Sequence, residues 1–288
     1  MTLDLVMPFW GLDRSQLDSR WIEQGRGVEA ILFSGEELSS LSLFERNIMT
    51  SGVEGPITLH FPMDADYVGR AEHREGLYKF IDVASRVGAH GVVLHSNTFV
   101  QLGAGPVDYV GLREQHLSFL HELDEHIAAA PLWVGVENMP LVGDDGSDTD
   151  GLFVYPEDYA GIDFGRVRAV FDVAHWVGTI QSGTQLRNVD VSAISLPPIR
   201  DGRPDSFGEI RDKVAHLHLS AMSGVASPLS GVHVVGGLVP DDAQSGTYAA
   251  AIRPFIDLGL TASLEIAERD YTQRSEIWRM VDWLEAQL

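Results

Sequence analysis

The sequence predicts a single α/β domain of the (β/α)8 class, a closed TIM barrel of eight parallel strands surrounded by helices. Its 288 residues, of which 44% are hydrophobic, are enough for one barrel of this kind. Strand-like apolar runs alternate with amphipathic helical patterns from one end of the chain to the other. A doubly wound open sheet is the alternative, but no glycine-rich phosphate loop follows the first run. No linker divides the chain, so we predict one domain over 1–288.

Eight runs have the apolar, partly alternating composition of strands. In chain order they are LDLVMPFW (3–10), VEAILFSG (28–35), ITLHFPMD (57–64), GVVLHSN (91–97), LWVGVENMP (132–140), RAVFDVAH (168–175), VAHLHLS (214–220) and ASLEIAE (262–268). Between several of them, apolar residues recur at intervals of three and four, the period of a helix with one buried face. The clearest helical patterns cover 77–84, 117–127 and 277–288.

Long connections follow three of the predicted strands. Residues 141–155 follow the fifth strand, about 179–208 follow the sixth, and the connection after the seventh is also long. In a barrel, the loops that follow the carboxyl ends of the strands build the active site and its lids. The aspartates between 144 and 150 lack the spacing of a calcium-binding EF-hand loop, so we expect a solvated acidic loop there.

Composition restricts the partners of this chain. The formal net charge is −22, from 20 basic and 42 acidic residues, and such a surface opposes the phosphate contacts on which nucleic-acid binding depends. No apolar run reaches the roughly 18 residues of a membrane span, and the N-terminus MTLDLVMPFWG lacks the basic start of a signal peptide. We therefore expect a cytoplasmic protein with a small-molecule partner, no nucleic acid and no membrane, and leave a homo-oligomer open. The absence of cysteine excludes disulfides and thiolate metal ligands.

Polar residues stand at the carboxyl ends of four predicted strands. In LWVGVENMP, strand alternation places the two valines on one face and Glu137 on the other. Equivalent positions on other strands hold Asp172, His218 and Glu265. Buried carboxylates without partners are costly, and several in one place repel one another. A divalent cation relieves both problems, and this donor set suits Mn²⁺, Zn²⁺, Co²⁺ or Fe²⁺. We therefore predict that these four residues bind a metal.

Histidines are also found at the carboxyl ends of the predicted strands, which form one rim of a barrel. His60, His95 and His175 lie in or just after predicted strands, and His233 lies in the loop after the seventh strand. Any one of them is as often a hydrogen-bonded structural residue as a ligand. Together they favour a chemical role, because packing alone does not call for acids and imidazoles on one rim. We take all four as candidates for additional metal ligands, and His95 and His175 also as candidates for substrate contact.

Other residues near strand ends are candidates for substrate contact. Trp10, Phe99 and Trp176 have flat apolar rings suited to the apolar face of a sugar, although each fits the core equally well. Arg269 is a candidate for binding a phosphate or carboxylate group.

The motifs ENMP, FDVAH, HLHLS, the later GVH and SLEI stand in this order along the chain. In that order they resemble the xylose-isomerase-like TIM barrel superfamily, which includes sugar isomerases and epimerases, inosose-processing enzymes and apurinic/apyrimidinic endonucleases. The resemblance covers about 60–265. For the mononuclear epimerase branch it implies that the four predicted ligands hold one metal, often Mn²⁺. It also implies that Glu137 and Glu265 exchange protons with the substrate and that His175 contacts it.

The endonuclease branch implies a different site. Its trinuclear zinc centre also uses histidines that match His60, His95, His175 and His233. This sequence departs from that branch at Gly231, where the branch has an aspartate, and at SAMSG, which replaces a DSK-like stretch. The missing carboxylate and the negative charge of the chain both favour the epimerase branch.

Three functional hypotheses follow. The first is a divalent-metal-dependent isomerase or epimerase of a sugar, cyclitol or related polyhydroxy carbonyl compound. In it the metal stabilises an enediolate, and Glu137 and Glu265 transfer the proton on opposite sides of the substrate carbon. The second is a di- or trinuclear metal-dependent hydrolase or lyase with His60, His95 and His233 as extra ligands. The third is a non-catalytic binding barrel, which leaves the complete set of acids and imidazoles unexplained. One metal per chain favours the first hypothesis, and two or three favour the second.

Overall fold

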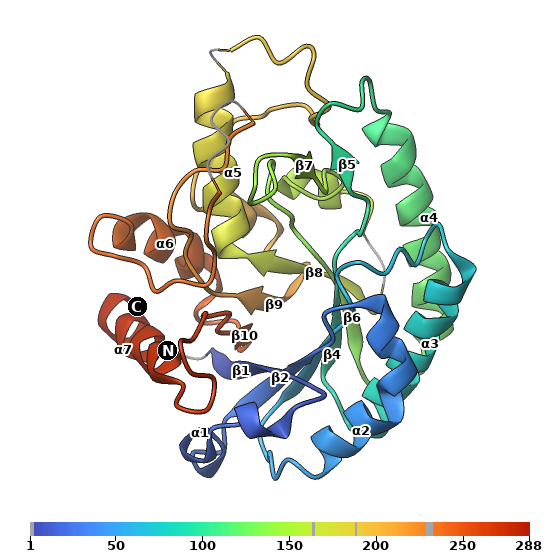
Figure 1. The fold of residues 1–288 in the computed structure, drawn as a ribbon, viewed down its shortest axis with the longest axis vertical. Coiled ribbons are helices and arrows are strands. Elements are labelled where there is room, and N and C mark those ends of the chain that lie inside the picture. The colour runs from blue at the N-terminus through green and yellow to red at the C-terminus, as the bar shows by residue number, and fades with distance from the viewer. Residues whose placement is uncertain (1–2, 163–164, 188, 229–232) are drawn as a thin grey trace.

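The computed structural model of the chain is a closed barrel of eight parallel strands, as the sequence predicted (Figure 1). It describes residues 3–162, 165–187, 189–228 and 233–288. In the order in which neighbours pair, the strands are β1 (Asp4–Trp10), β10 (Thr261–Ser263), β9 (Val214–His218), β8 (Val167–Asp172), β6 (Trp133–Glu137), β4 (Gly91–Leu94), β3 (Ile57–His60) and β2 (Gly27–Ile31). Each strand overlaps one of the predicted runs.

Helices follow most of the strands. The α-helices are α1 (Ser19–Glu23), α2 (Leu41–Met49), α3 (Ala71–Arg86), α4 (Tyr109–Ile127), α5 (Val173–Leu186), α6 (Ser245–Ile252) and α7 (Ser275–Gln287). The 3-10 helices are η1 (Arg14–Gln16), η2 (Gly35–Ser40), η3 (Pro156–Tyr159), η4 (Ser206–Ile210) and η5 (Arg253–Phe255). The three predicted helical patterns lie in α3, α4 and α7.

One predicted strand–helix unit is incomplete. In the described part of the chain between β6 and β8, the only helix is η3. Pro156 begins this turn and Gly161 follows shortly after it. The stretch between them is too short for a helix of several turns.

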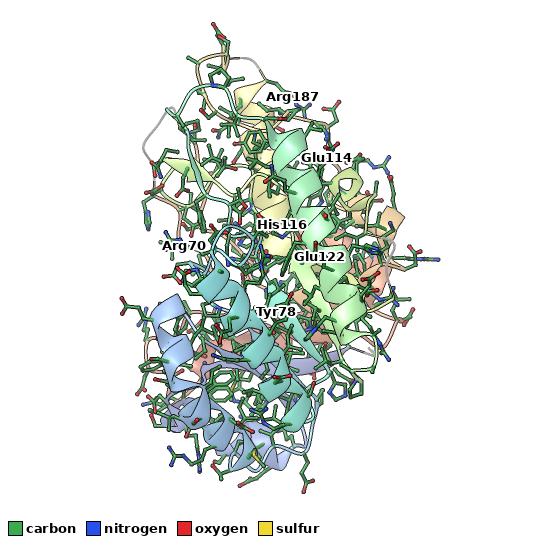
Figure 2. All side chains as sticks on the ribbon, turned by 90° about the vertical axis from the view of Figure 1, so that its right-hand side faces the viewer. Arg70, Tyr78, Glu114, His116, Glu122 and Arg187 are labelled. Atoms are coloured by element: carbon green, nitrogen blue, oxygen red, sulfur yellow. The ribbon has the colours of Figure 1, made fainter. Side chains whose placement is uncertain are left out.

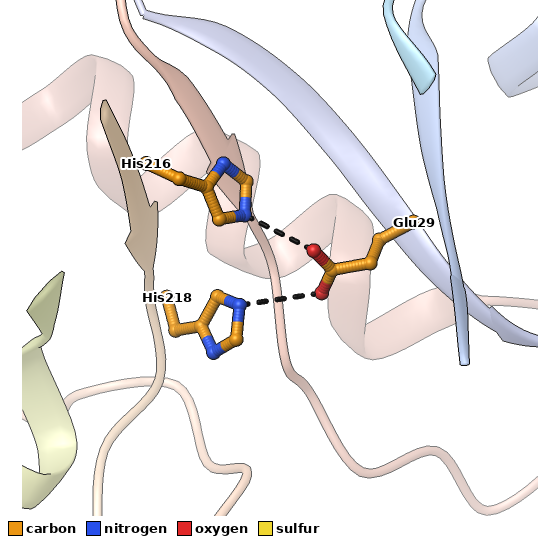
Figure 3. Close-up of side chains that lie close together, drawn as sticks. All are labelled: Glu29, His216 and His218. Atoms are coloured by element: carbon orange, nitrogen blue, oxygen red, sulfur yellow. Dashed lines mark ion pairs between the residues drawn. The ribbon is translucent and has the colours of Figure 1, made fainter. Parts of the chain in front are cut away.

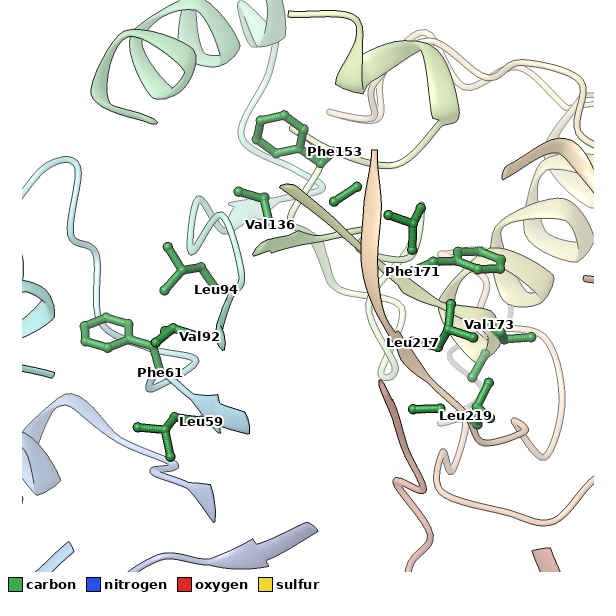
Figure 4. Close-up of a cluster of buried hydrophobic side chains, with 14 of the residues drawn as sticks. Leu59, Phe61, Val92, Leu94, Val136, Phe153, Phe171, Val173, Leu217 and Leu219 are labelled. Carbon is green, nitrogen blue, oxygen red and sulfur yellow. The ribbon is translucent and has the colours of Figure 1, made fainter. Parts of the chain in front are cut away.

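Apolar side chains on the outer faces of the strands form the core between the barrel and its helices (Figure 4). On β9, Leu217 belongs to this core and is followed by Leu219, whereas His216 and His218 alternate with them. The histidines point inward, because both pair with Glu29 on β2 although β1 and β10 separate the two strands. On β9, therefore, the apolar residues face the helices and the histidines face the barrel interior.

The amino-terminal half of the barrel interior is packed. The indole ring of Trp133, at the start of β6, lies with its centroid 5.6 Å from that of His216. A Cβ on Gly91 would lie 2.1 Å from this ring, and one on Gly135 would lie 2.4 Å from Val170. Both positions therefore require glycine, which lets large side chains fill the interior.

Helices α3 and α4 pack side by side on the outside of the barrel (Figure 2). The rings of Tyr78 and His126 join them, with centroids 4.6 Å apart. His116 on α4 is a packing residue, because it is buried with Nε2 2.9 Å from the Tyr67 hydroxyl. Among the helices that the structure describes, none combines the length and the apolar character needed to span a membrane.

The long connections pack on one another beyond the carboxyl ends of the strands. β5 (Val100–Gln101), after β4, pairs with β7 (Asp148–Thr149), after β6, in a two-stranded antiparallel sheet. The connection after α5 joins them, since the backbone N–H of Ser195 donates to the carbonyl of Leu102.

The segment after β8 differs from the prediction. The predicted strand 168–175 ends at Asp172, because the Asp172 side chain accepts a hydrogen bond from the N–H of His175 and caps α5. Residues 179–186, predicted as the start of a long loop, continue this helix. α5 nevertheless lies at the barrel mouth, because Thr179 Oγ1 accepts a hydrogen bond from the N–H of Leu141, just beyond β6.

Candidate metal centre

Four strand ends bring four ligand-type side chains into one cluster. Glu137, Asp172 and His218 are the last residues of β6, β8 and β9, and Glu265 lies two residues beyond β10. One oxygen or nitrogen atom of each lies within 4.8 Å of the others. His218 Nδ1 is 3.1 Å from Glu137 Oε2 and 3.3 Å from Glu265 Oε1. We call these four residues the tetrad; they are the four that the sequence predicted as metal ligands.

Glu137 lies at the centre of a ring of imidazoles. Its Oε2 is 3.2 Å from His95 Nε2 and 3.6 Å from His60 Nε2. Its Oε1 is 3.2 Å from His175 Nδ1. Together, His60, His95 and Glu137 form a second group of ligand-type atoms within 4.8 Å of one another. Three of the four histidines predicted as additional ligands therefore lie beside the tetrad.

Asn138, which the sequence reasoning did not single out, positions two of these residues. Its Oδ1 accepts a hydrogen bond from the N–H of Asp172 at 2.7 Å, and its Nδ2 donates to the Asp172 carbonyl at 3.0 Å. Its own carbonyl lies 2.9 Å from His175 Nδ1. The only sequence signal was its place directly after Glu137 at the end of the strand.

Burial and charge shift the pKa values of the tetrad in different directions. Burial raises the pKa of Glu265 to about 7, with the carboxylates of Glu137 and Asp172 adding to the effect against His218. Burial also raises the pKa of Asp172. The pKa of Glu137 is instead held well below its usual range, because His218 and His95 outweigh its burial.

Nearby carboxylates raise the pKa of two imidazoles in this site, His175 and the tetrad member His218. Burial disfavours the charged form of His175, but Asp172 and Glu137 raise its pKa to about 10. Burial is likewise outweighed at His218, where Glu137 and Glu265 raise the pKa well above its usual range. His95 behaves differently, because burial prevails and lowers its pKa. Positive charge on His175 and His218 thus offsets the negative charge of the carboxylates.

The donor set fits a divalent cation. Glu137 Oε2 and His218 Nδ1 are buried and lack a hydrogen-bond partner within the described ranges. Three carboxylates in one largely buried cluster repel one another unless cations lie between them. Carboxylate and imidazole donors together suit Mn²⁺, Zn²⁺, Co²⁺ or Fe²⁺. The tetrad would hold such an ion, and His60, His95 and His175 lie close enough to extend the site.

Glu29 is the second residue that the sequence reasoning missed. This glutamate lies in the middle of β2, is fully buried, and approaches His216 and His218 from across the barrel (Figure 3). The signal was present in the sequence, because Glu29 is the only charged residue in the run VEAILF. Only barrel closure shows which side chains it meets.

Other predicted site residues lie outside the cluster. His233 is exposed, and its neighbour Val234 donates a backbone hydrogen bond to Asp144 in the acidic loop. The groups of clustered ligand atoms within the described residues do not include His233. Arg269 is exposed just beyond β10, and Gly231 lies outside the described residues.

The three aromatic residues predicted to contact substrate lie in different environments. Trp176 lies in the core: it is fully buried, its ring packs against Phe207, and Nε1 donates to the carbonyl of Arg203. Trp176 and His175 are successive residues of a helix, so their side chains point in different directions. Phe99 is 52% exposed on the connection after β4. Trp10, at the end of β1, lines a cavity of about 210 Å³ together with Glu265.

The chain shares its fold with solved structures. No protein-family model and no curated protein matches it. The TTHB071 protein from Thermus thermophilus, soaked with ZnCl2, superposes with a TM-score of 0.63 at 18% identity, over 99% of this chain and 98% of that one. The 3-keto-D-glucoside 4-epimerase YcjR from E. coli gives 0.59 at 15% identity, over 99% of both chains.

Endonuclease IV from Thermus thermophilus is also similar, with a TM-score of 0.56 at 13% identity over 98% of both chains. Sugar epimerases and endonuclease IV are thus among the solved structures that share this fold. The resemblance predicted from the motifs is confirmed at the level of fold.

Proposed function

We propose that this protein is a divalent-metal-dependent isomerase or epimerase of a sugar, cyclitol or related polyhydroxy carbonyl compound. The observation that carries the proposal is the placement of Glu137 and Glu265. They come from β6 and β10, which β8 and β9 separate in the barrel, and both lie within 3.3 Å of His218 Nδ1. A substrate carbon between them would face one carboxylate on each side.

The two glutamates would move one proton. One carboxylate removes the proton from the carbon next to the carbonyl, and the C–H electron pair passes into the carbon–carbon bond of an enediolate. The other glutamate returns a proton to the opposite face, so that the carbon inverts with no net change in composition. A bound divalent ion supplies Lewis acidity toward the substrate oxygens. His175, beside Glu137, would donate to a substrate hydroxyl.

The cavity beside Glu265 supports a sugar-like substrate. It opens at the carboxyl ends of β1, β2 and β10, and its walls include the side chains of Trp10, Phe33 and Tyr271. Flat aromatic faces suit the apolar C–H face of a sugar or cyclitol ring, and polar side chains of the site suit its hydroxyl groups.

The test uses proton exchange, which does not require the natural product to be known. The purified protein with added Mn²⁺ is incubated in D2O with a panel of ketoses, keto-glycosides and inososes, and NMR follows deuterium incorporation at carbon. We expect exchange in the wild type, loss of it in Glu137→Gln and Glu265→Gln, and no change in the surface control Glu122→Gln (Figure 2). Activity close to wild type in either site variant would remove that glutamate from the mechanism.

A second candidate is a multinuclear metal-dependent hydrolase or lyase. The specific observation in its favour is the second group of ligand atoms, from His60, His95 and Glu137. Metal content of wild type and of a His60→Ala/His95→Ala double variant separates the two. A mononuclear site keeps one ion per chain in both proteins. A multinuclear site starts with two or three ions and loses at least one in the double variant.

A further inference from the structure

We propose that Glu29 is a positioning residue that orients the His218 imidazole, so that Nδ1 is left to bind the metal. This inference rests on the metal site of the proposed function. Glu29 lies on β2 and is fully buried, and its carboxylate reaches the inner face of β9 (Figure 3). It is not a member of the tetrad, and its contact with the tetrad is through His218.

The Glu29 carboxylate is itself held in one orientation. Its Oε2 accepts a hydrogen bond from Thr58 Oγ1 at 2.9 Å and lies 3.1 Å from His216 Nε2. The remaining ring nitrogen of His216, Nδ1, lies 2.6 Å from Thr261 Oγ1. The hydrogen bond from Thr58 and the ion-pair contact with His216 hold Oε2, and Oε1 lies 3.3 Å from His218 Nε2.

The two nitrogens of His218 face different partners. Nε2 faces Glu29 Oε1, while Nδ1 faces Glu137 and Glu265. An imidazole that binds a metal through one nitrogen keeps a single N–H on the other, and an ionised carboxylate can only accept hydrogen bonds. Glu29 therefore favours the tautomer with hydrogen on Nε2. The lone pair on Nδ1 then points at the tetrad, and the negative charge behind the ring makes Nδ1 a stronger donor to a metal.

A purely structural role explains Glu29 poorly. A buried carboxylate is costly, and an apolar side chain of similar size would fill the same space without that cost. Its contacts are Thr58 and two histidines, and one of those is a predicted metal ligand. The arrangement is that of a carboxylate behind a metal-binding imidazole, which in metal sites fixes ring orientation and raises affinity.

The main test is metal affinity. Mn²⁺ and Zn²⁺ are titrated into metal-free wild type, Glu29→Gln and Thr58→Val, with thermal unfolding of each metal-free protein followed in parallel. Glutamine keeps the shape of Glu29 and removes its charge, so we expect metal affinity to fall by about 10–100-fold with the same number of ions per chain. Thr58→Val keeps the charge and removes one hydrogen bond, and we expect a change of less than about threefold. The melting temperature of metal-free Glu29→Gln should not fall.

The tautomer gives a second test in the wild type itself, which does not depend on the folding of Glu29→Gln. In the Zn²⁺-loaded, 15N-labelled protein, long-range 15N–1H spectra should show His218 with hydrogen on Nε2. Hydrogen on Nδ1 would overturn the proposal. So would wild-type metal affinity in a folded Glu29→Gln, or a loss of one whole ion per chain, which would make Glu29 a ligand of a second metal. A wild type that binds no metal would instead contradict the proposed function.

Discussion

At the scale of single residues, Asp172 has two roles that different substitutions separate. Its carboxylate belongs to the tetrad, and the same side chain accepts the hydrogen bond from His175 that begins α5. A cap and a ligand site therefore share one residue, at the point where a strand becomes a helix.

We expect Asp172→Asn to separate these roles. Asparagine caps helices as well as aspartate does. Burial disfavours the charged form of Asp172 and so raises its pKa, and asparagine carries no charge to bury. The metal-free variant should therefore be no less stable than the wild type. Metal affinity should fall by at least about tenfold, because an anionic ligand is lost. Asp172→Ala also loses the cap and should cost about 1 kcal/mol more in the free energy of unfolding.

The measurements are metal titration and urea unfolding, with His175→Ala as the control. His175 lies outside the tetrad, so this variant should keep its metal and lose substrate affinity or turnover instead. Full metal affinity in Asp172→Asn would show that Asp172 is a cap only.

At the scale of elements, a buried carboxylate joins the connections after β4 and β6. Asp150, just beyond β7, is 3% exposed, and its Oδ1 accepts hydrogen bonds from Ser96 Oγ and from the N–H of Thr98. Burial raises the pKa of Asp150 to about 6, in spite of these hydrogen bonds. Asp150 therefore links the two connections, and its ionisation at neutral pH lowers the free energy of unfolding.

The sign of the pH dependence follows from this shift. The ordinary pKa of Asp150 is 3.8 and the folded value is about 6, so the folded state holds the proton more tightly. The free energy of unfolding that the tighter proton binding contributes is fully present below about pH 4 and is lost as the pH rises through about 6. Asp150→Asn should therefore raise the free energy of unfolding at pH 8, by about 3 kcal/mol at most.

Urea unfolding of wild type and Asp150→Asn from pH 4 to pH 8 measures the effect. The matched control is Asp145→Asn on the same connection, because Asp145 is exposed and the hydroxyl of Ser147 lowers its pKa. The control should not be stabilised at pH 8. Equal stabilisation of both variants would attribute the gain to reduced charge repulsion in the loop.

At the scale of the whole molecule, charge determines which partners can approach. The chain has 20 basic and 42 acidic residues. Nucleic-acid binding gains most of its affinity from cations that neutralise phosphates. The similarity in fold to endonuclease IV does not change this balance.

We therefore expect no binding of an abasic-site duplex at about 150 mM salt. Fluorescence anisotropy with a labelled duplex measures it, and an intact duplex of the same length is the control. Micromolar binding that weakens as salt rises would revive the endonuclease-like candidate.

The sequence by itself determined the barrel and the tetrad. Alternation along each strand assigned Glu137, Asp172, His218 and Glu265 to inner faces near the carboxyl ends, and these ends meet in any closed parallel barrel. No long-range detail was needed, because the period of a strand and the topology of the fold are enough to bring such positions together.

Tertiary structure decided the features that depend on closure of the barrel, on the register of its strands and on competition between strand and helix at one segment. The partners of Glu29 lie across the barrel, and no local pattern names them. The start of α5 at Asp172 depended on a side-chain cap that replaced three residues of predicted strand. That helix in turn buried Trp176, since successive helical residues point about 100° apart whereas strand residues alternate. His233 ended beside the acidic loop, because the path of a long connection follows from packing between distant segments.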